Sequence, residues 1–155
     1  MNIKNKKRIF WIILILWLGV IFFLSSQTGD ESGVISEGMT ESVVQTTDQE
    51  NPVYKFVEKI IRKSGHFAEY AILGILACLA FCCDKKSVKR YLAVFVFGTF
   101  YAMTDEIHQL YVPKRSGEVR DIFFDACGVL LGILAFVFIF KIMEKKRLTN
   151  NTKKV

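Results

Sequence analysis

Ionisable and hydrogen-bonding side chains gather in three short groups at the ends of apolar runs, and these groups are the part of the chain suited to chemistry. In chain order they comprise Lys63, His66, Glu69 and Tyr70, then Asp105, Glu106, His108, Gln109 and Arg115, and last Asp121 and Asp125. Residues three or four apart share a helix face, so each group is expected to point one way. Carboxylates and imidazoles can move protons, and cationic side chains can hold phosphate or carboxylate.

Two kinds of site fit these residue types. The candidate ligand-binding residues are Lys63, His66, Glu69, Tyr70, Gln109, Arg115, Asp121 and Asp125. The candidate catalytic residues are Glu106 and Asp105 as general bases, with His66 and His108 as acids or anion stabilisers. The sequence leaves open whether the site binds a ligand or also transfers protons.

Structural and metal-binding interpretations compete with both kinds of site. His66 and Glu69 can form an intrahelical hydrogen bond, and Arg115 can pair with the Asp105–Glu106 step or with Asp121. The same side chains also offer nitrogen and oxygen ligands that zinc or manganese accepts. The sequence has only two histidines, however, and they are not closely spaced. We therefore predict neither a metal nor a cofactor.

Four apolar runs must position these groups. They cover about residues 9–26, 65–83, 91–108 and 122–143 of a 155-residue chain that is 52% hydrophobic. Runs of this length suit helices that cross a hydrocarbon core about 30 Å thick. A basic flank before the first run is also typical of a signal peptide, but no A-x-A-like cleavage site follows it. We predict a single all-α domain over residues 1–155, an integral four-helix bundle of the cell membrane.

The positions of the basic residues predict the orientation of this bundle. Two thirds of the 21 Lys and Arg lie before the first run, between the second and third runs, and after the fourth. The positive-inside rule then places both termini in the cytoplasm and residues 27–63 and 104–121 outside. All three polar groups fall in the outer leaflet as a result. Because the basic residues flank apolar runs, the net charge of +6 does not predict nucleic-acid binding.

The outer segment 27–63 divides into two parts. Residues 28–52 are rich in Gly, Ser, Thr, Glu and Gln, a composition that does not order itself alone. Beyond them, apolar residues at positions 53, 56, 57, 60 and 61 indicate an amphipathic helix. We expect that extracytoplasmic helix to lie in the membrane interface, or to pack without lipid contact, before the chain turns inward at Gly65.

Small residues and cysteines inside the runs have structural interpretations. Gly128 and Gly132 form a small-xxx-small pattern that lets another backbone approach the fourth helix closely. The cysteines Cys78, Cys82, Cys83 and Cys127 fit neither a zinc site nor a C-x-x-C redox pair, so we predict buried free thiols. Asp125 lies one turn inside the fourth helix, where a cation must meet its charge or the carboxyl must be neutral.

The ordered motifs resemble the VanZ-like family of small bacterial membrane proteins. They are Gly65-His66-Phe67-x-Glu69-Tyr70, Asp105-Glu106-x-His108-Gln109, the Pro113/Arg115 turn, Asp121-x-x-x-Asp125-x-x-Gly128 and Leu24-Ser25-Ser26-Gln27. The likeness covers about residues 10–140. It departs at Asp125, where many members have Asn, and at Lys114, where many have Gly. The family's eponym is associated with resistance to the glycopeptide antibiotic teicoplanin, which the resemblance implies as a possible setting.

These observations lead to one expected function and one alternative. An outward polar pocket is expected to recognise a cell-envelope component or an amphiphilic, glycopeptide-type antibiotic, with membrane lipids as the surrounding partners and a role in antibiotic resistance. The alternative is a membrane-embedded acid/base enzyme that acts on a lipid-linked envelope substrate. Proton-coupled transport fits less well, because the ionisable residues do not continue to the cytoplasmic side.

Overall fold

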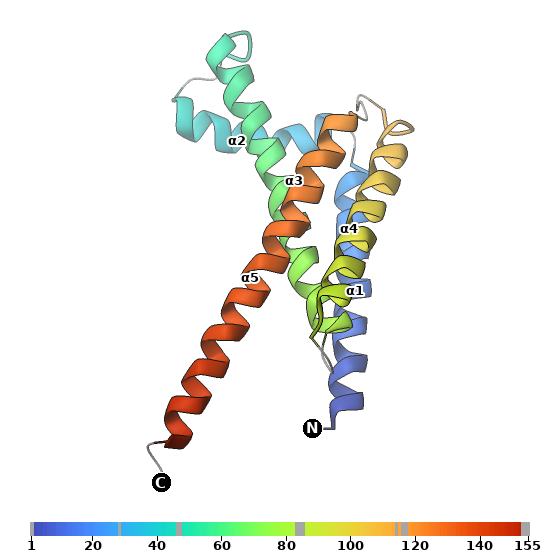
Figure 1. The fold of residues 1–155 in the computed structure, drawn as a ribbon. Coiled ribbons are helices and arrows are strands. Elements are labelled where there is room, and N and C mark those ends of the chain that lie inside the picture. Colours follow the sequence, from blue (N-terminus) through green and yellow to red (C-terminus); the bar gives the residue numbers. More distant parts are fainter. Residues whose placement is uncertain are drawn as a thin grey trace.

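The computed structural model describes residues 2–27, 29–45, 48–82, 86–113, 115 and 118–152. The secondary structure of its described residues consists of helices: α1 (Ile3–Ser25), α2 (Gly29–Val44), α3 (Pro52–Phe81), α4 (Val88–Gln109) and α5 (Val119–Thr152). Along the long axis in Figure 1, α1 and α4 run in one direction while α3 and α5 run in the other. The start of α1 and the end of α5 therefore lie at the same end of the molecule, and the end of α4 and the start of α5 lie at the opposite end.

Three helices, α1, α3 and α5, are long and apolar enough to cross a membrane. The fourth predicted span corresponds to α4, which packs on α3 and α5 but carries polar and charged residues that lower its hydropathy. Its buried face includes Asp105, Glu106 and Gln109, which are three of the candidate catalytic and ligand-binding residues. The structure thus gives an all-α fold with three candidate spans, and the orientation across the membrane stays a prediction.

Residues 29–44, whose composition did not predict a helix, form α2. This helix lies across the beginning of α3 in Figure 1 and packs on it. Ser36 and Thr40 are buried there, Ser36 Oγ donates a 3.3 Å hydrogen bond to Glu58 Oε1, and the Tyr54 side chain is 1% exposed. Composition alone did not predict the helical order of this segment, because that order depends on contact with α3. Helices in proteins are stabilised chiefly by tertiary packing.

The predicted turn at Gly65 is also wrong, because α3 continues without interruption through it. Asn51 caps the helix by accepting from the Val53 N–H, Pro52 occupies the first turn, and the helix runs for 30 residues. At 1.5 Å per residue it is about 45 Å long, which exceeds the bilayer core. The amphipathic segment is therefore the first part of α3 and not a separate interfacial helix.

Glycines hold α3 and α5 together at their crossing, as the small-xxx-small pattern predicted. A methyl group on Gly132 would lie 2.1 Å from the Ala71 carbonyl oxygen, and one on Gly128 would lie 2.6 Å from the Phe67 carbonyl oxygen. From the other helix, a methyl group on Gly74 would lie 2.4 Å from the Val129 carbonyl oxygen. Because these contacts are with backbone, no side chain can move aside to relieve them.

The close crossing predicts a large effect of a single methyl group. Gly132→Ala is expected to lower the free energy of unfolding by about 1–3 kcal/mol or more, since overpacking displaces the backbone. Gly19→Ala is the matched control, because nothing lies within 4 Å of a methyl group there. Because alanine has a better helix propensity than glycine, Gly19→Ala should raise the free energy of unfolding by at most about 1 kcal/mol. Thermal unfolding in detergent compares the two, and equal melting temperatures would contradict the close crossing.

The core beneath the polar end is built from all four long helices. Fully buried residues include Leu14 and Ile21 of α1, Leu73 of α3, Val94 of α4 and Val129 of α5. The predicted burial of the thiols is confirmed for Cys78 and Cys82, whereas Cys127 is only partly buried. Cys83 lies outside the described residues.

Candidate functional site

The three polar groups meet at the end of the bundle where α1 and α4 end and α5 begins. A cleft of about 250 Å³ opens between the first half of α3 and the segment that joins α4 to α5. Its lining consists of Glu58, Lys59, Arg62, Lys63, His66, Gln109, Arg115, Glu118 and Asp121. Among the candidate residues, five line this cleft and come from all three groups. Their convergence follows from the alternating directions of the helices.

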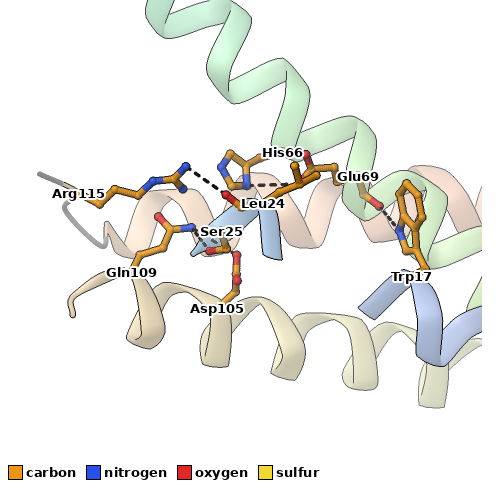
Figure 2. Close-up of polar contacts among 8 residues, drawn as sticks. All are labelled: Trp17, Leu24, Ser25, His66, Glu69, Asp105, Gln109 and Arg115. Carbon is orange, nitrogen blue, oxygen red and sulfur yellow. Dashed lines mark hydrogen bonds and ion pairs between the residues drawn. The ribbon is translucent and has the colours of Figure 1, made fainter. Parts of the chain in front are cut away.

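The end of α1 supplies contacts that the sequence analysis did not assign to the site. The Gln109 amide donates hydrogen bonds to Ser25 Oγ at 3.0 Å and to Asp105 Oδ2 at 3.3 Å (Figure 2). Ser25 is fully buried, so this hydroxyl fixes the amide against the last turn of α1. The sequence feature that could have indicated this role of Ser25 is the pair of serines at the end of the first apolar run.

His108 turns toward α1 and does not line the cleft. Its Nε2 lies 3.1 Å from Ser26 Oγ, and its ring stacks on Phe22 with centroids 4.6 Å apart. Of the two candidate imidazoles, only His66 therefore reaches the cleft. This geometry favours a structural role for His108.

Lys63 is held by acidic residues at the start of α5. Its Nζ pairs with Asp121 Oδ1 and lies 3.8 Å from Glu118 Oε2. The same ammonium lies 5.4 Å from the centroid of the Phe124 ring. Lys63 thus joins α3 to α5, and its charge is already partly neutralised by carboxylates.

The predicted ion pair of Arg115 is wrong, because its guanidinium bonds to backbone instead. Arg115 Nη2 donates to the Leu24 carbonyl at 3.4 Å, at the end of α1 (Figure 2). Among the described residues, no carboxylate lies within ion-pair distance of it. Burial, and then the charge of Arg62, lower the pKa of Arg115 from its ordinary value. A guanidinium in this position can form planar, bidentate bonds to phosphate or carboxylate.

His66 and Glu69 lie on one face of α3, as their spacing predicted. His66 Nδ1 is 3.8 Å from Glu69 Oε2, which is within ion-pair range but too far for a hydrogen bond. The Glu69 side chain borders a separate cavity of about 220 Å³, which Met39 of α2 also lines. The backbone carbonyl of Glu69 accepts from Trp17 Nε1 at 3.1 Å (Figure 2). Glu69 therefore lies beside the cleft and not in it.

The remaining candidates lie below the cleft. Asp105 is 3% exposed, Asp125 1% and Tyr70 0%. Glu106 accepts the Glu118 backbone N–H at 2.9 Å and so holds the segment that enters α5. Within the described residues, no set of three or more His, Cys, Asp or Glu side chains is arranged to hold a metal ion.

An apolar groove adjoins the polar cleft. It has a volume of about 540 Å³ and runs between the first half of α3 and the start of α5. Phe56, Ile60, Phe67 and Phe124 form its apolar wall. Lys59, Lys63 and Glu118 line both the groove and the cleft, so the two form one continuous surface.

Comparison with known proteins adds the family. The VanZ/LLP1 family model matches residues 10–141, which is most of the chain. The chain belongs to the VanZ/LLP1 family. No curated protein and no solved structure matches it. The matched range of this VanZ/LLP1 protein contains every residue that lines the cleft and the groove.

Family membership and the three apolar helices together make this a membrane protein. The resemblance that the sequence motifs suggested is thereby confirmed. The VanZ/LLP1 match assigns neither a ligand nor a role to any polar residue.

Proposed function

We propose that this membrane protein recognises an amphiphile of the cell envelope through an anionic headgroup and an attached apolar chain. The observation that carries the proposal is the continuity of the cleft with the groove through Lys59, Lys63 and Glu118. A headgroup in the cleft would meet Arg115, while the chain would lie against Phe67 and Phe124. Binding sites of this size are usually apolar with a few well-placed polar groups.

The apolar half of the proposal predicts the effect of filling the groove. Ser64 is exposed on the groove wall, so Ser64→Trp should occupy the groove without disturbing the core. We expect at least about tenfold weaker binding of short-chain phosphatidic acid, since each buried methylene contributes about 0.8 kcal/mol. Val96→Trp, at a 58% exposed position of α4, is the matched control. Equal affinities of the two variants in a detergent-based binding assay would count against a chain in the groove.

Two sources offer the same ligand chemistry, an envelope lipid and an amphiphilic antibiotic. Teicoplanin added to the same assay distinguishes them. Displacement of phosphatidic acid by the antibiotic would assign the site to both and would connect it to resistance. Failure of teicoplanin to compete would leave the envelope lipid as the ligand.

A membrane-embedded acid/base enzyme is the second candidate. It is favoured by the buried Asp105, whose Oδ1 has no hydrogen-bond partner among the described residues. Glu106, the other candidate base, is occupied by the Glu118 N–H. Recovery of a chemically altered lipid-linked envelope intermediate, lost in Asp105→Asn and in Glu106→Gln, would establish the enzyme. Recovery of the unaltered amphiphile supports recognition alone.

The proposal also requires that the polar end face outward, as the basic residues predict. In a variant without the native cysteines, Ser42→Cys on α2 should react with a membrane-impermeant thiol reagent in intact cells. Lys89→Cys at the opposite end should react only after lysis. Both positions are exposed, so burial does not account for a difference. The reverse pattern would place the cleft in the cytoplasm.

A further inference from the structure

A small cavity lies directly below the polar cleft. It measures about 20 Å³ and shares Lys63, His66 and Gln109 with the cleft above. Asp125 lines it, is 1% exposed, and has an Oδ2 without a hydrogen-bond partner among the described residues. A volume of this size holds a single group as large as a water molecule.

Two further buried polar atoms, on residues that do not line this cavity, also lack a hydrogen-bond partner among the described residues. They are the Tyr70 hydroxyl, on a 0% exposed side chain, and Asp105 Oδ1, on a 3% exposed one. Tyr70 and Asp105 interact with each other, so their two atoms can satisfy one another. Buried polar atoms nearly always have a partner, so a hydrogen-bond donor in the cavity beside Asp125 Oδ2 fits this site.

The distribution of charge points to a cation as that donor. Lys63 is already paired with Asp121, and Arg115 bonds to the Leu24 carbonyl. Among the described residues, no cationic side chain is within ion-pair distance of Asp125. A metal ion is a poor candidate, since the described residues form no metal-binding group. A primary ammonium group has three N–H donors and about the volume of a water molecule.

We propose that the cavity binds the primary ammonium group of a zwitterionic amphiphile whose phosphate lies in the cleft above, near Arg115. The inference rests on the proposed function and specifies the headgroup as an aminoalkyl phosphate, of which phosphoethanolamine is the simplest example. A trimethylammonium group is excluded by size and by its lack of N–H donors. The source can be a lipid headgroup or a soluble aminoalkyl phosphate.

Three dihexanoyl lipids with identical chains test the inference on the purified full-length protein in nonionic detergent. We expect phosphatidylethanolamine to bind at least about tenfold more tightly than phosphatidic acid or phosphatidylcholine. Only its ammonium can donate hydrogen bonds in the cavity, and hydrogen bonds that involve charged groups are stronger than those between neutral groups. Soluble O-phosphoethanolamine tests the source: competition at similar concentration indicates a soluble ligand, and much weaker competition indicates a lipid.

Variants separate Asp125 from the rest of the site. In Asp125→Asn the preference for phosphatidylethanolamine should fall to within about twofold, while Glu144→Gln, an exposed carboxyl at the other end of α5, should keep it. Equal binding of all three lipids by the unmodified protein, or a preference that survives in Asp125→Asn, would overturn the ammonium site and leave the proposed function intact. Failure of all three lipids to bind would overturn the proposed function itself. The comparison of lipids on the unmodified protein decides the question even where the variant does not fold.

Discussion

Arg115→Gln is expected to weaken the binding of an anionic amphiphile by about 10-fold to 100-fold, because charge-assisted hydrogen bonds to a bound anion contribute about 1.5–3 kcal/mol. The guanidinium is partly buried at the cleft and bonds only weakly to the Leu24 carbonyl at 3.4 Å. Its loss therefore removes an interaction with the ligand more than one within the protein. Affinity for short-chain phosphatidic acid, measured in nonionic detergent, gives the effect.

A control and a salt series separate this effect from general electrostatics. Arg147→Gln removes an exposed guanidinium at the far end of α5 and should leave the affinity within about twofold. Raising the ionic strength should weaken binding to the unmodified protein more than binding to Arg115→Gln, because salt screens the lost charge. Unchanged affinity in Arg115→Gln, with normal folding, would remove Arg115 from the site.

Asp125→Leu is expected to raise the thermal stability of the protein while it abolishes the preference for phosphatidylethanolamine. The carboxyl is 1% exposed, its Oδ2 has no partner, and no described cation is in contact with it. Removing an unsatisfied buried polar group stabilises the folded protein by about 1–3 kcal/mol. A buried charge often costs more stability than it contributes. Retention of so costly a group is typical of a residue that serves function at the expense of stability.

Asp125→Asn is the matched variant for this prediction. It keeps the shape and polarity of the side chain, so insertion and folding should be intact and stability close to that of the unmodified protein. Melting temperature in detergent and susceptibility of cells to an envelope-directed antibiotic are measured side by side. A fall in melting temperature in Asp125→Leu, or loss of folding in Asp125→Asn, would make Asp125 a structural residue. The site would then consist of the cleft and the groove without the cavity below them.

The sequence predicted the convergence of polar residues because that result depends only on helix direction and depth. His66, Gln109 and Asp121 occur at the same end of successive apolar runs, and the cost of exposing them to lipid drives them together. The glycine crossing was predictable for a similar reason, since the spacing of Gly128 and Gly132 places both on one face of a helix.

Other features were not predictable because they depend on tertiary contacts. The polar helix α2 is ordered by its contact with α3, where Tyr54 is buried although the periodicity did not place it on the apolar face. The partner of Arg115 depends on the path of the segment between α4 and α5, and a backbone carbonyl at the end of α1 gives no signal in the sequence. His108 was placed in the site by its spacing alone, whereas its stacking on Phe22 turns it away.

The measurement that tests the central claim most directly is photo-crosslinking with an anionic lipid that carries a photoreactive group in its chain, close to the headgroup. The account predicts that the crosslinked peptides map to the first half of α3 and the start of α5, around Phe67 and Phe124, and that Ser64→Trp removes them while Val96→Trp does not. Crosslinks spread evenly over the exposed apolar faces of α1, α4 and the second half of α5, unaffected by Ser64→Trp, would contradict it.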